Sequence, residues 1–151
     1  MHFLKDVIEN QDGYRYFYAD GEPIRRESDL HILFRLTWYA TPSDINREVN
    51  NGRGPVDFKS SRGSADSTLI EFKLASNSKL KNNLEKQVEI YKKANNTEKA
   101  IKVIVYFTES ERNKVYKILE DLDLKDDENI ILINARNALK DLAGSLPGTA
   151  G

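Results

Sequence analysis

The segment Gly54–Ala75, "GPVDFKSSRGSADSTLIEFKLA", contains two apolar runs separated by a turn-forming stretch, a pattern that predicts two antiparallel strands. Three charged residues, Asp57, Glu71 and Lys73, interrupt these runs. A charge inside a sheet is costly to bury unless it is paired or binds a metal ion. The hairpin therefore indicates both that the fold contains a sheet and where on the sheet chemistry is expected.

The spacing of the three charges predicts a shared site. Successive side chains of a strand point to opposite faces, so Glu71 and Lys73 lie on one face. If the turn is centred near Ser64, Asp57 lies directly across from Glu71, at about 5 Å. Two carboxylates this close repel each other unless a cation joins them, and their hard oxygen atoms favour Mg²⁺ or Mn²⁺ over zinc. A register shifted by one residue would separate them.

A polar residue in the following helix points to the same site. The stretch "SKLKNNLEKQVEIYKKANN" predicts a helix whose buried stripe contains Leu80, Leu84, Val88 and Tyr91. Gln87 lies in this stripe, where an apolar residue is expected. A buried amide needs hydrogen-bond partners, and a site that holds a metal ion, water and phosphate would supply them.

The remaining pattern predicts one mixed α/β domain over residues 1–143 and a flexible tail over residues 144–151. The aromatic stretch Tyr14–Pro23 is expected to be a short strand, and the segment "TPSDINREVNNG", which starts at Thr41, a second short helix. The other expected elements are a helix at 27–40, strands at about 56–60, 68–75, 99–108 and 129–135, a helix at 108–122, and a short helix through Leu142.

Composition narrows the classes of function. The 151 residues are 39% hydrophobic, which suits one domain with a core, and the net charge of −1 gives no global attraction for nucleic acid. The absence of cysteine excludes disulfides, thiolate zinc sites and cysteine nucleophiles. Neither a signal peptide nor a membrane span is evident. We therefore expect a cytoplasmic protein without a membrane partner.

Together these residues resemble the PD-(D/E)XK nuclease superfamily, over Gly54 to about Thr108. Glu71-Phe72-Lys73 matches the E-x-K motif, and Val56-Asp57 stands where the family usually has Pro-Asp, with Pro55 one position early. Gln87–Tyr91 fits the Q-x-x-x-Y motif of the RecB-like branch. The resemblance implies a restriction-endonuclease-like αβββαβ core, in which helices flank a central mixed sheet.

The resemblance also implies a function, the Mg²⁺- or Mn²⁺-dependent hydrolysis of DNA phosphodiester bonds. Asp57, Glu71 and the backbone carbonyl of Phe72 would bind the metal ion, Lys73 would position or activate the attacking water, and Gln87 would steady the site. Many members add an acid from an earlier helix. Glu48, which is near in sequence, is preferred here over Glu27.

Four residues are candidates for binding the DNA itself: Tyr91, Arg53, Lys59 and Arg62. His31 is expected to be a packed core residue rather than a ligand, because no second histidine neighbours it.

Other interpretations remain open at this point. Asp57, Glu71 and Lys73 could form a salt-bridged solvent face of the hairpin. A catalytically silent module could keep the fold for nucleic-acid binding or assembly. The sequence does not distinguish DNA from RNA, endonuclease from exonuclease, or a monomer from a homodimer.

Overall fold

A five-stranded mixed sheet forms the centre of the protein. The computed structural model describes residues 1–37, 44–50, 55–61, 67–93 and 99–137. The sheet order is β3-β4-β5-β6-β7, with β3 to β5 antiparallel and β5 to β7 parallel. The strands are β3 (Asp44–Asn50), β4 (Pro55–Ser61), β5 (Ser67–Leu74), β6 (Lys99–Tyr106) and β7 (Ile130–Asn134).

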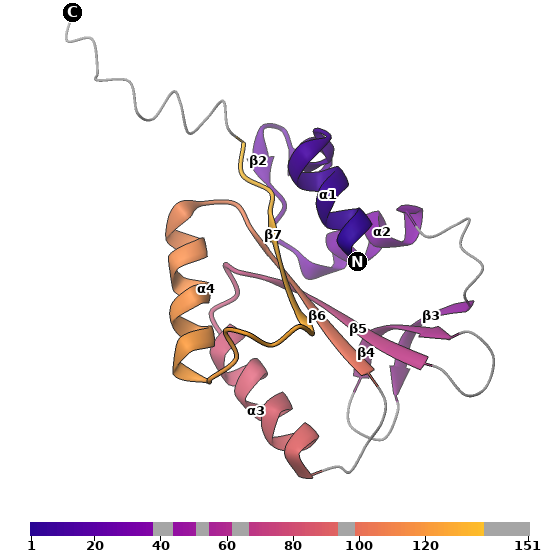
Figure 1. Cartoon of the computed structure of the whole chain (residues 1–151). Helices are drawn as coiled ribbons and strands as arrows, with labels where there is room; N and C mark the ends of the chain where they lie inside the picture. The colour runs from indigo at the N-terminus through magenta and orange to yellow at the C-terminus, as the bar shows by residue number, and fades with distance from the viewer. Residues whose placement is uncertain (38–43, 51–54, 62–66, 94–98, 138–151) are drawn as a thin grey trace, which may run out of the picture.

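Helices cover both faces of the sheet (Figure 1). They are α1 (His2–Asn10), α2 (Glu27–Thr37), α3 (Leu80–Lys93) and α4 (Glu109–Asp121). One core joins α1 and α2 to the sheet, and a second core joins α3 and α4 to its other face. Ile70, Phe72 and Leu74 of β5 belong to the first core. Because side chains alternate along a strand, Glu71 and Lys73 belong to the face covered by α3 and α4.

The predicted register of the hairpin is confirmed. Phe58 pairs with Ile70 and Ser61 with Ser67, so the two strands are symmetric about position 64. The described ladder ends at the Phe58–Ile70 pair, so Asp57 and Glu71 are the next two residues of this register, directly beyond its end. The expected start of α4 is also confirmed, since the Thr108 Oγ1 accepts a hydrogen bond from the Glu111 backbone N–H at 3.1 Å.

The predicted short helix at "TPSDINREVNNG" is wrong, because its described part, Asp44–Asn50, is strand β3. Thr41 and Pro42 suggested a helix start, but pairing with β4 satisfies the backbone of the next residues in a ladder. The two apolar residues of this stretch, Ile45 and Val49, are four positions apart, a spacing that fits one face of a strand as well as one face of a helix.

The N-terminal region also departs from expectation. The stretch Tyr14–Pro23 is not one strand: a 3-10 helix, η1 (Gly13–Phe17), precedes a small hairpin of β1 (Tyr18–Ala19) and β2 (Glu22–Pro23). Before it lies α1, a helix that the sequence analysis did not predict. The expected helix through Leu142, the end of the 1–143 domain and the tail at 144–151 lie outside the described residues.

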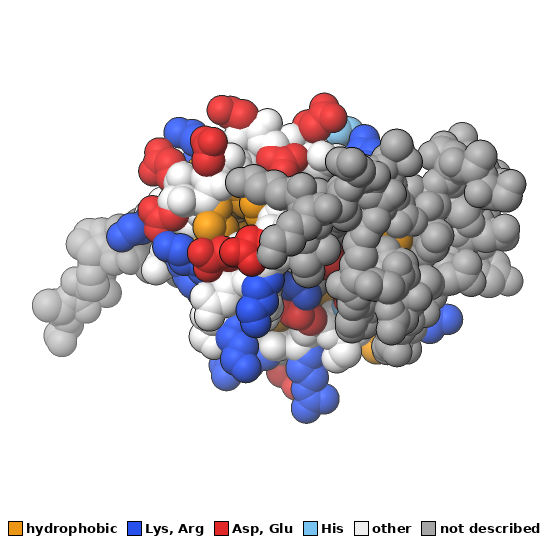
Figure 2. All heavy atoms as spheres, turned by 90° about the horizontal axis from the view of Figure 1, so that it is seen from below, with side chains coloured by type: hydrophobic (Ala, Val, Ile, Leu, Met, Phe, Trp, Pro, Cys, Tyr) orange, Lys and Arg blue, Asp and Glu red, His pale blue; other side chains and the backbone are white. Residues whose placement is uncertain are grey.

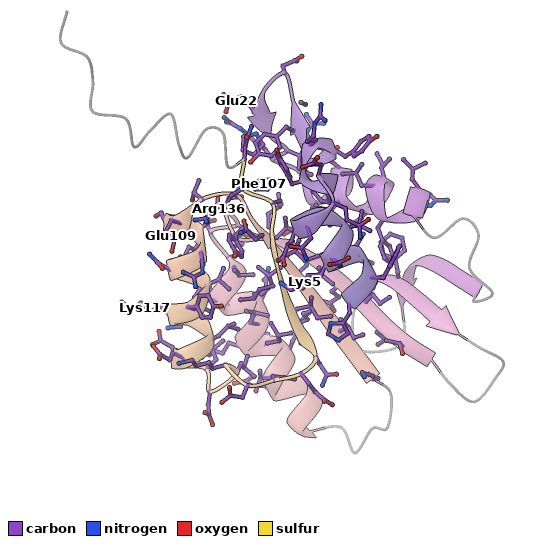
Figure 3. All side chains as sticks on the ribbon, turned by 45° about the horizontal axis from the view of Figure 1, so that its top comes forward. Lys5, Glu22, Phe107, Glu109, Lys117 and Arg136 are labelled. Atoms are coloured by element: carbon purple, nitrogen blue, oxygen red, sulfur yellow. The ribbon has the colours of Figure 1, made fainter. Side chains whose placement is uncertain are left out.

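Polar contacts anchor β7 between α1 and α4 (Figure 3). Lys5 of α1 donates a hydrogen bond to the Leu132 carbonyl, and Arg136, two residues after β7, donates to Glu109 of α4. These contacts hold the parallel edge of the sheet. In the described part of the chain, no helix is long and apolar enough to cross a membrane.

Candidate functional site

Beyond the end of the β4–β5 ladder, two side-chain carboxylates accept hydrogen bonds from backbone N–H groups of β5. In the described residues the β4–β5 ladder ends at Phe58 with Ile70. Beyond it, Asp57 Oδ2 accepts the Phe72 N–H at 2.6 Å, and Glu27 Oε1 accepts the Leu74 N–H at 3.3 Å. The N–H groups of alternate residues point to the same edge of a strand. Both carboxylates therefore lie along one edge of β5.

The carbonyl of Phe72 belongs to this edge as well. A residue whose N–H points to one side of a strand has its C=O on the same side. The Phe72 N–H points to Asp57. The predicted backbone ligand thus projects from the stretch of β5 that the two carboxylates flank.

Glu71 is buried under α3, at 7% exposure, and accepts a hydrogen bond from Gln87 Nε2. The amide nitrogen of Gln87, for which the sequence analysis expected partners at the site, thus donates to one of its carboxylates. The amide oxygen, Oε1, is buried without a hydrogen-bond partner among the described residues. A solvent-exposed hairpin face does not describe Glu71, because α3 covers it.

Lys73 lies beside the acid at the start of α2. Its Nζ is 3.7 Å from Glu27 Oε2, and both side chains are partly buried. Glu27 Oε1 also accepts a hydrogen bond from Asn77 Nδ2 at 2.9 Å. Glu27 is thus tied to the end of β5 and to the turn that leads into α3.

Glu48, the preferred early acid, belongs to strand β3 and not to a helix. Arg47 pairs with Phe58 and Val49 with Val56, so the backbone register brings Glu48 opposite Asp57. Its side chain lies outside what the structure describes. Among the described side chains, Glu27 is the early acid in contact with Lys73.

His31 reaches the site, which the sequence analysis did not predict. Its Nε2 lies 3.1 Å from Asp57 Oδ2, but the two atoms are not aligned for a hydrogen bond, and Nε2 is buried without one among the described residues. The ring also packs edge-on against Phe58, as a core histidine would. The signal that could have found it is helical spacing, because Glu27 and His31 are four residues apart and share a face of α2.

Lys102 is a second residue that the sequence analysis missed. It is the register partner of Glu71 on β6 and is 9% exposed. Burial lowers the pKa of Lys102, while the charges of Glu71 and Asp127 oppose that shift. The signal was a single lysine within the otherwise apolar run Ala100–Phe107.

The described residues contain no group of three His, Asp or Glu side chains already arranged to hold a metal ion. The chemistry of the donors nevertheless fits Mg²⁺ or Mn²⁺, since Asp57 and Glu71 supply carboxylate oxygens. His31 Nε2 and Gln87 Oε1 are also buried polar atoms that lack a hydrogen-bond partner there. Buried polar groups of this kind normally have a partner.

The side chains of the four predicted DNA-binding residues lie outside what the structure describes. Arg53 and Arg62 lie outside the described residues. Lys59 and Tyr91 belong to β4 and α3, but their side chains lie outside what the structure describes.

Residues 1–109 match the family described as a domain of unknown function, DUF8371. The chain belongs to this family. The matched DUF8371 region runs from α1 to the first residue of α4, and so contains Asp57, Glu71, Lys73 and Gln87 together with His31 and Lys102. No curated protein sequence matches the chain.

Proposed function

We propose that this DUF8371 protein is a metal-dependent nuclease that hydrolyses DNA phosphodiester bonds on a restriction-endonuclease-like core. The observation that carries the proposal is the hydrogen bond from Gln87 to Glu71, which closes α3 over the strand of the E-x-K motif. Support comes from the element order α2-β3-β4-β5-α3-β6, which is the αβββαβ order that the resemblance implies.

Asp57, Glu71, His31 and the Phe72 carbonyl are the groups that would hold the metal ion. A bound Mg²⁺ or Mn²⁺ would supply positive charge to the phosphodiester oxygens and make water nucleophilic at neutral pH. The chain's own contribution is orientation. The Phe72 N–H fixes the Asp57 carboxylate, and the Gln87 amide fixes that of Glu71.

Lys73, two residues after Glu71 on the same strand, would contact the water or the substrate. Its ammonium can donate a hydrogen bond to the attacking water or to a phosphoryl oxygen, where charge develops in the transition state. Glu27, at 3.7 Å, restricts where that ammonium lies. In this proposal the positioned lysine and the ordered carboxylates lower the barrier because they need little reorganisation when the reaction occurs.

DNA would have to be attracted by local charge. On the face seen in Figure 2, Lys and Arg side chains gather in the lower part, with a few acidic side chains among them. Such a surface suits contacts to a phosphate backbone, which position a nucleic acid without reading its sequence.

The experiment is a cleavage assay with Mg²⁺ or Mn²⁺, and with EDTA, on supercoiled plasmid, linear duplex DNA, single-stranded DNA and RNA. Glu71→Gln should abolish cleavage, while Lys99→Met, an exposed change on β6, should leave it unchanged. Plasmid nicking would indicate an endonuclease. If the protein binds DNA in every condition without cleaving it, the catalytically silent module is the better description.

A further inference from the structure

Two buried charges of opposite sign face each other across the centre of the sheet. Glu71 of β5 and Lys102 of β6 are register partners, 7% and 9% exposed. These two strands lie side by side beneath α3 and α4 (Figure 1). Removing one partner of a buried pair leaves the other charge uncompensated and is strongly destabilising. Replacing both partners with well-packed apolar residues is often neutral or stabilising. Stability alone therefore does not explain why two charges occupy this place.

The two side chains share a face. Ile104 and Tyr106 of β6 belong to the core under α3 and α4, so alternation puts Lys102 on that face. Ile70 and Phe72 belong to the opposite core, which leaves Glu71 on the same face as Lys102. Asp127, in the segment between α4 and β7, is the other acid whose charge acts on Lys102.

The charges at the site limit how many cations it can take. Among the described residues, the carboxylates are those of Asp57, Glu71, Glu27 and Asp127, and the ammonium groups are those of Lys73 and Lys102. The carboxylates outnumber the ammonium groups by two, so one divalent cation would neutralise the described charges. A second cation would have to approach Lys102, and like charges disfavour each other at short range.

We propose that Lys102 is a built-in counter-ion of Glu71, which keeps that carboxylate ordered and restricts the site to a single divalent cation. The inference rests on the proposed function, because it takes Asp57 and Glu71 as the metal ligands. Lys102 is a positioning residue, since it acts through Glu71 rather than on the substrate.

The test is the stoichiometry and affinity of Mn²⁺ binding, measured by calorimetry on the full chain without nucleic acid. Wild type should bind one ion. Lys102→Met should bind Mn²⁺ about tenfold more tightly or take up a second ion, because it loses a repelling charge. Lys102→Arg keeps the charge and should resemble wild type. Lys99→Met, exposed on the same strand, controls for the loss of any lysine.

The Mn²⁺ stoichiometry of wild type and the affinity of Lys102→Met each test the role of Lys102. Wild type that binds two ions, or a Lys102→Met protein that binds like wild type, overturns the role of Lys102 while the metal site stands. Wild type that binds no Mn²⁺ overturns the metal site and the role of Lys102 together. If Lys102→Met does not fold, Lys102→Gln takes its place, and the wild-type stoichiometry still tests the limit of one ion.

A metal-free measurement tests the pairing separately. Lys102→Met should lower the melting temperature, because it leaves Glu71 buried without its counter-ion. Adding Glu71→Gln should restore part of the loss, so the two changes should not be additive. Additive effects would mean that the two charges do not interact, and the proposal would fall.

Discussion

The amide of Gln87 donates a hydrogen bond to Glu71 from a helix position that faces the same way as Leu80 and Leu84. Those two leucines are fully buried against the sheet, so an apolar residue at position 87 would extend their packing. The amide nitrogen is satisfied by a carboxylate, but its oxygen is buried without a partner among the described residues. A residue that gives up packing to orient a carboxylate is expected to serve the site rather than the fold.

Gln87→Leu should separate these two roles. In wild type, the unpaired Gln87 oxygen costs about 1–3 kcal/mol, and the hydrogen bond from the amide nitrogen to Glu71 contributes a similar amount. The variant loses both, so its free energy of unfolding should change by less than about 1 kcal/mol. Cleavage of DNA should fall to a small fraction of wild type. Urea denaturation and a nuclease assay measure the two effects. Lys86→Leu, exposed on the same helix, is the control. A Gln87→Leu protein that is destabilised yet fully active would make the amide structural.

The hairpin could be predicted because its information is local. Alternation of side chains and symmetry about Ser64 fix which residues of two neighbouring strands meet, and Gln87 follows from helical spacing alone. Strand β3 was misjudged because Thr41 and Pro42 give a strong local signal, whereas pairing with β4 is decided by the sheet.

His31 and Lys102 were missed for a related reason. Their partners, Asp57 and Glu71, lie on elements that reach them only after the helices and parallel strands pack. No periodicity within α2 or β6 specifies that packing. What the sequence does contain, in each case, is a polar residue among apolar neighbours.

Asp57→Asn should remove metal binding without disturbing the fold. Asparagine keeps an oxygen that can accept the Phe72 N–H, but it lacks the charge that attracts a divalent cation. In wild type, Mn²⁺ at 100 times its Kd should stabilise the native state by about 2.7 kcal/mol, which raises Tm by about 5–10 °C in a domain of this size. Calorimetric scans with and without Mn²⁺ measure this. Equal shifts in wild type and Asp57→Asn would place the ion elsewhere.

His31→Phe tests whether the imidazole is a ligand or only a packed ring. Phenylalanine preserves the contact with Phe58 and removes Nε2, so the metal-free protein should be as stable as wild type or more stable. Its affinity for Mn²⁺ should fall at least about tenfold, as the loss of a group in or next to a metal shell usually does. Titration followed by Tm measures both quantities. Unchanged affinity would return His31 to the role of a core residue.

Lys73→Ala and Glu27→Gln together test how the lysine acts. If Lys73 stabilises only the transition state, Lys73→Ala should lower kcat by about 100-fold or more and leave folding and Mn²⁺ binding intact.

Glu27→Gln keeps an oxygen for the Leu74 N–H and the Asn77 amide, but no longer holds the Lys73 ammonium by charge. It should therefore lower kcat less than Lys73→Ala does, and the double variant should be no slower than Lys73→Ala alone, because residues acting as a unit are not additive. A Glu27→Gln protein that has lost Mn²⁺ affinity would instead make Glu27 the early metal-binding acid. A Lys73→Ala protein that cleaves at the wild-type rate would remove the lysine from the mechanism.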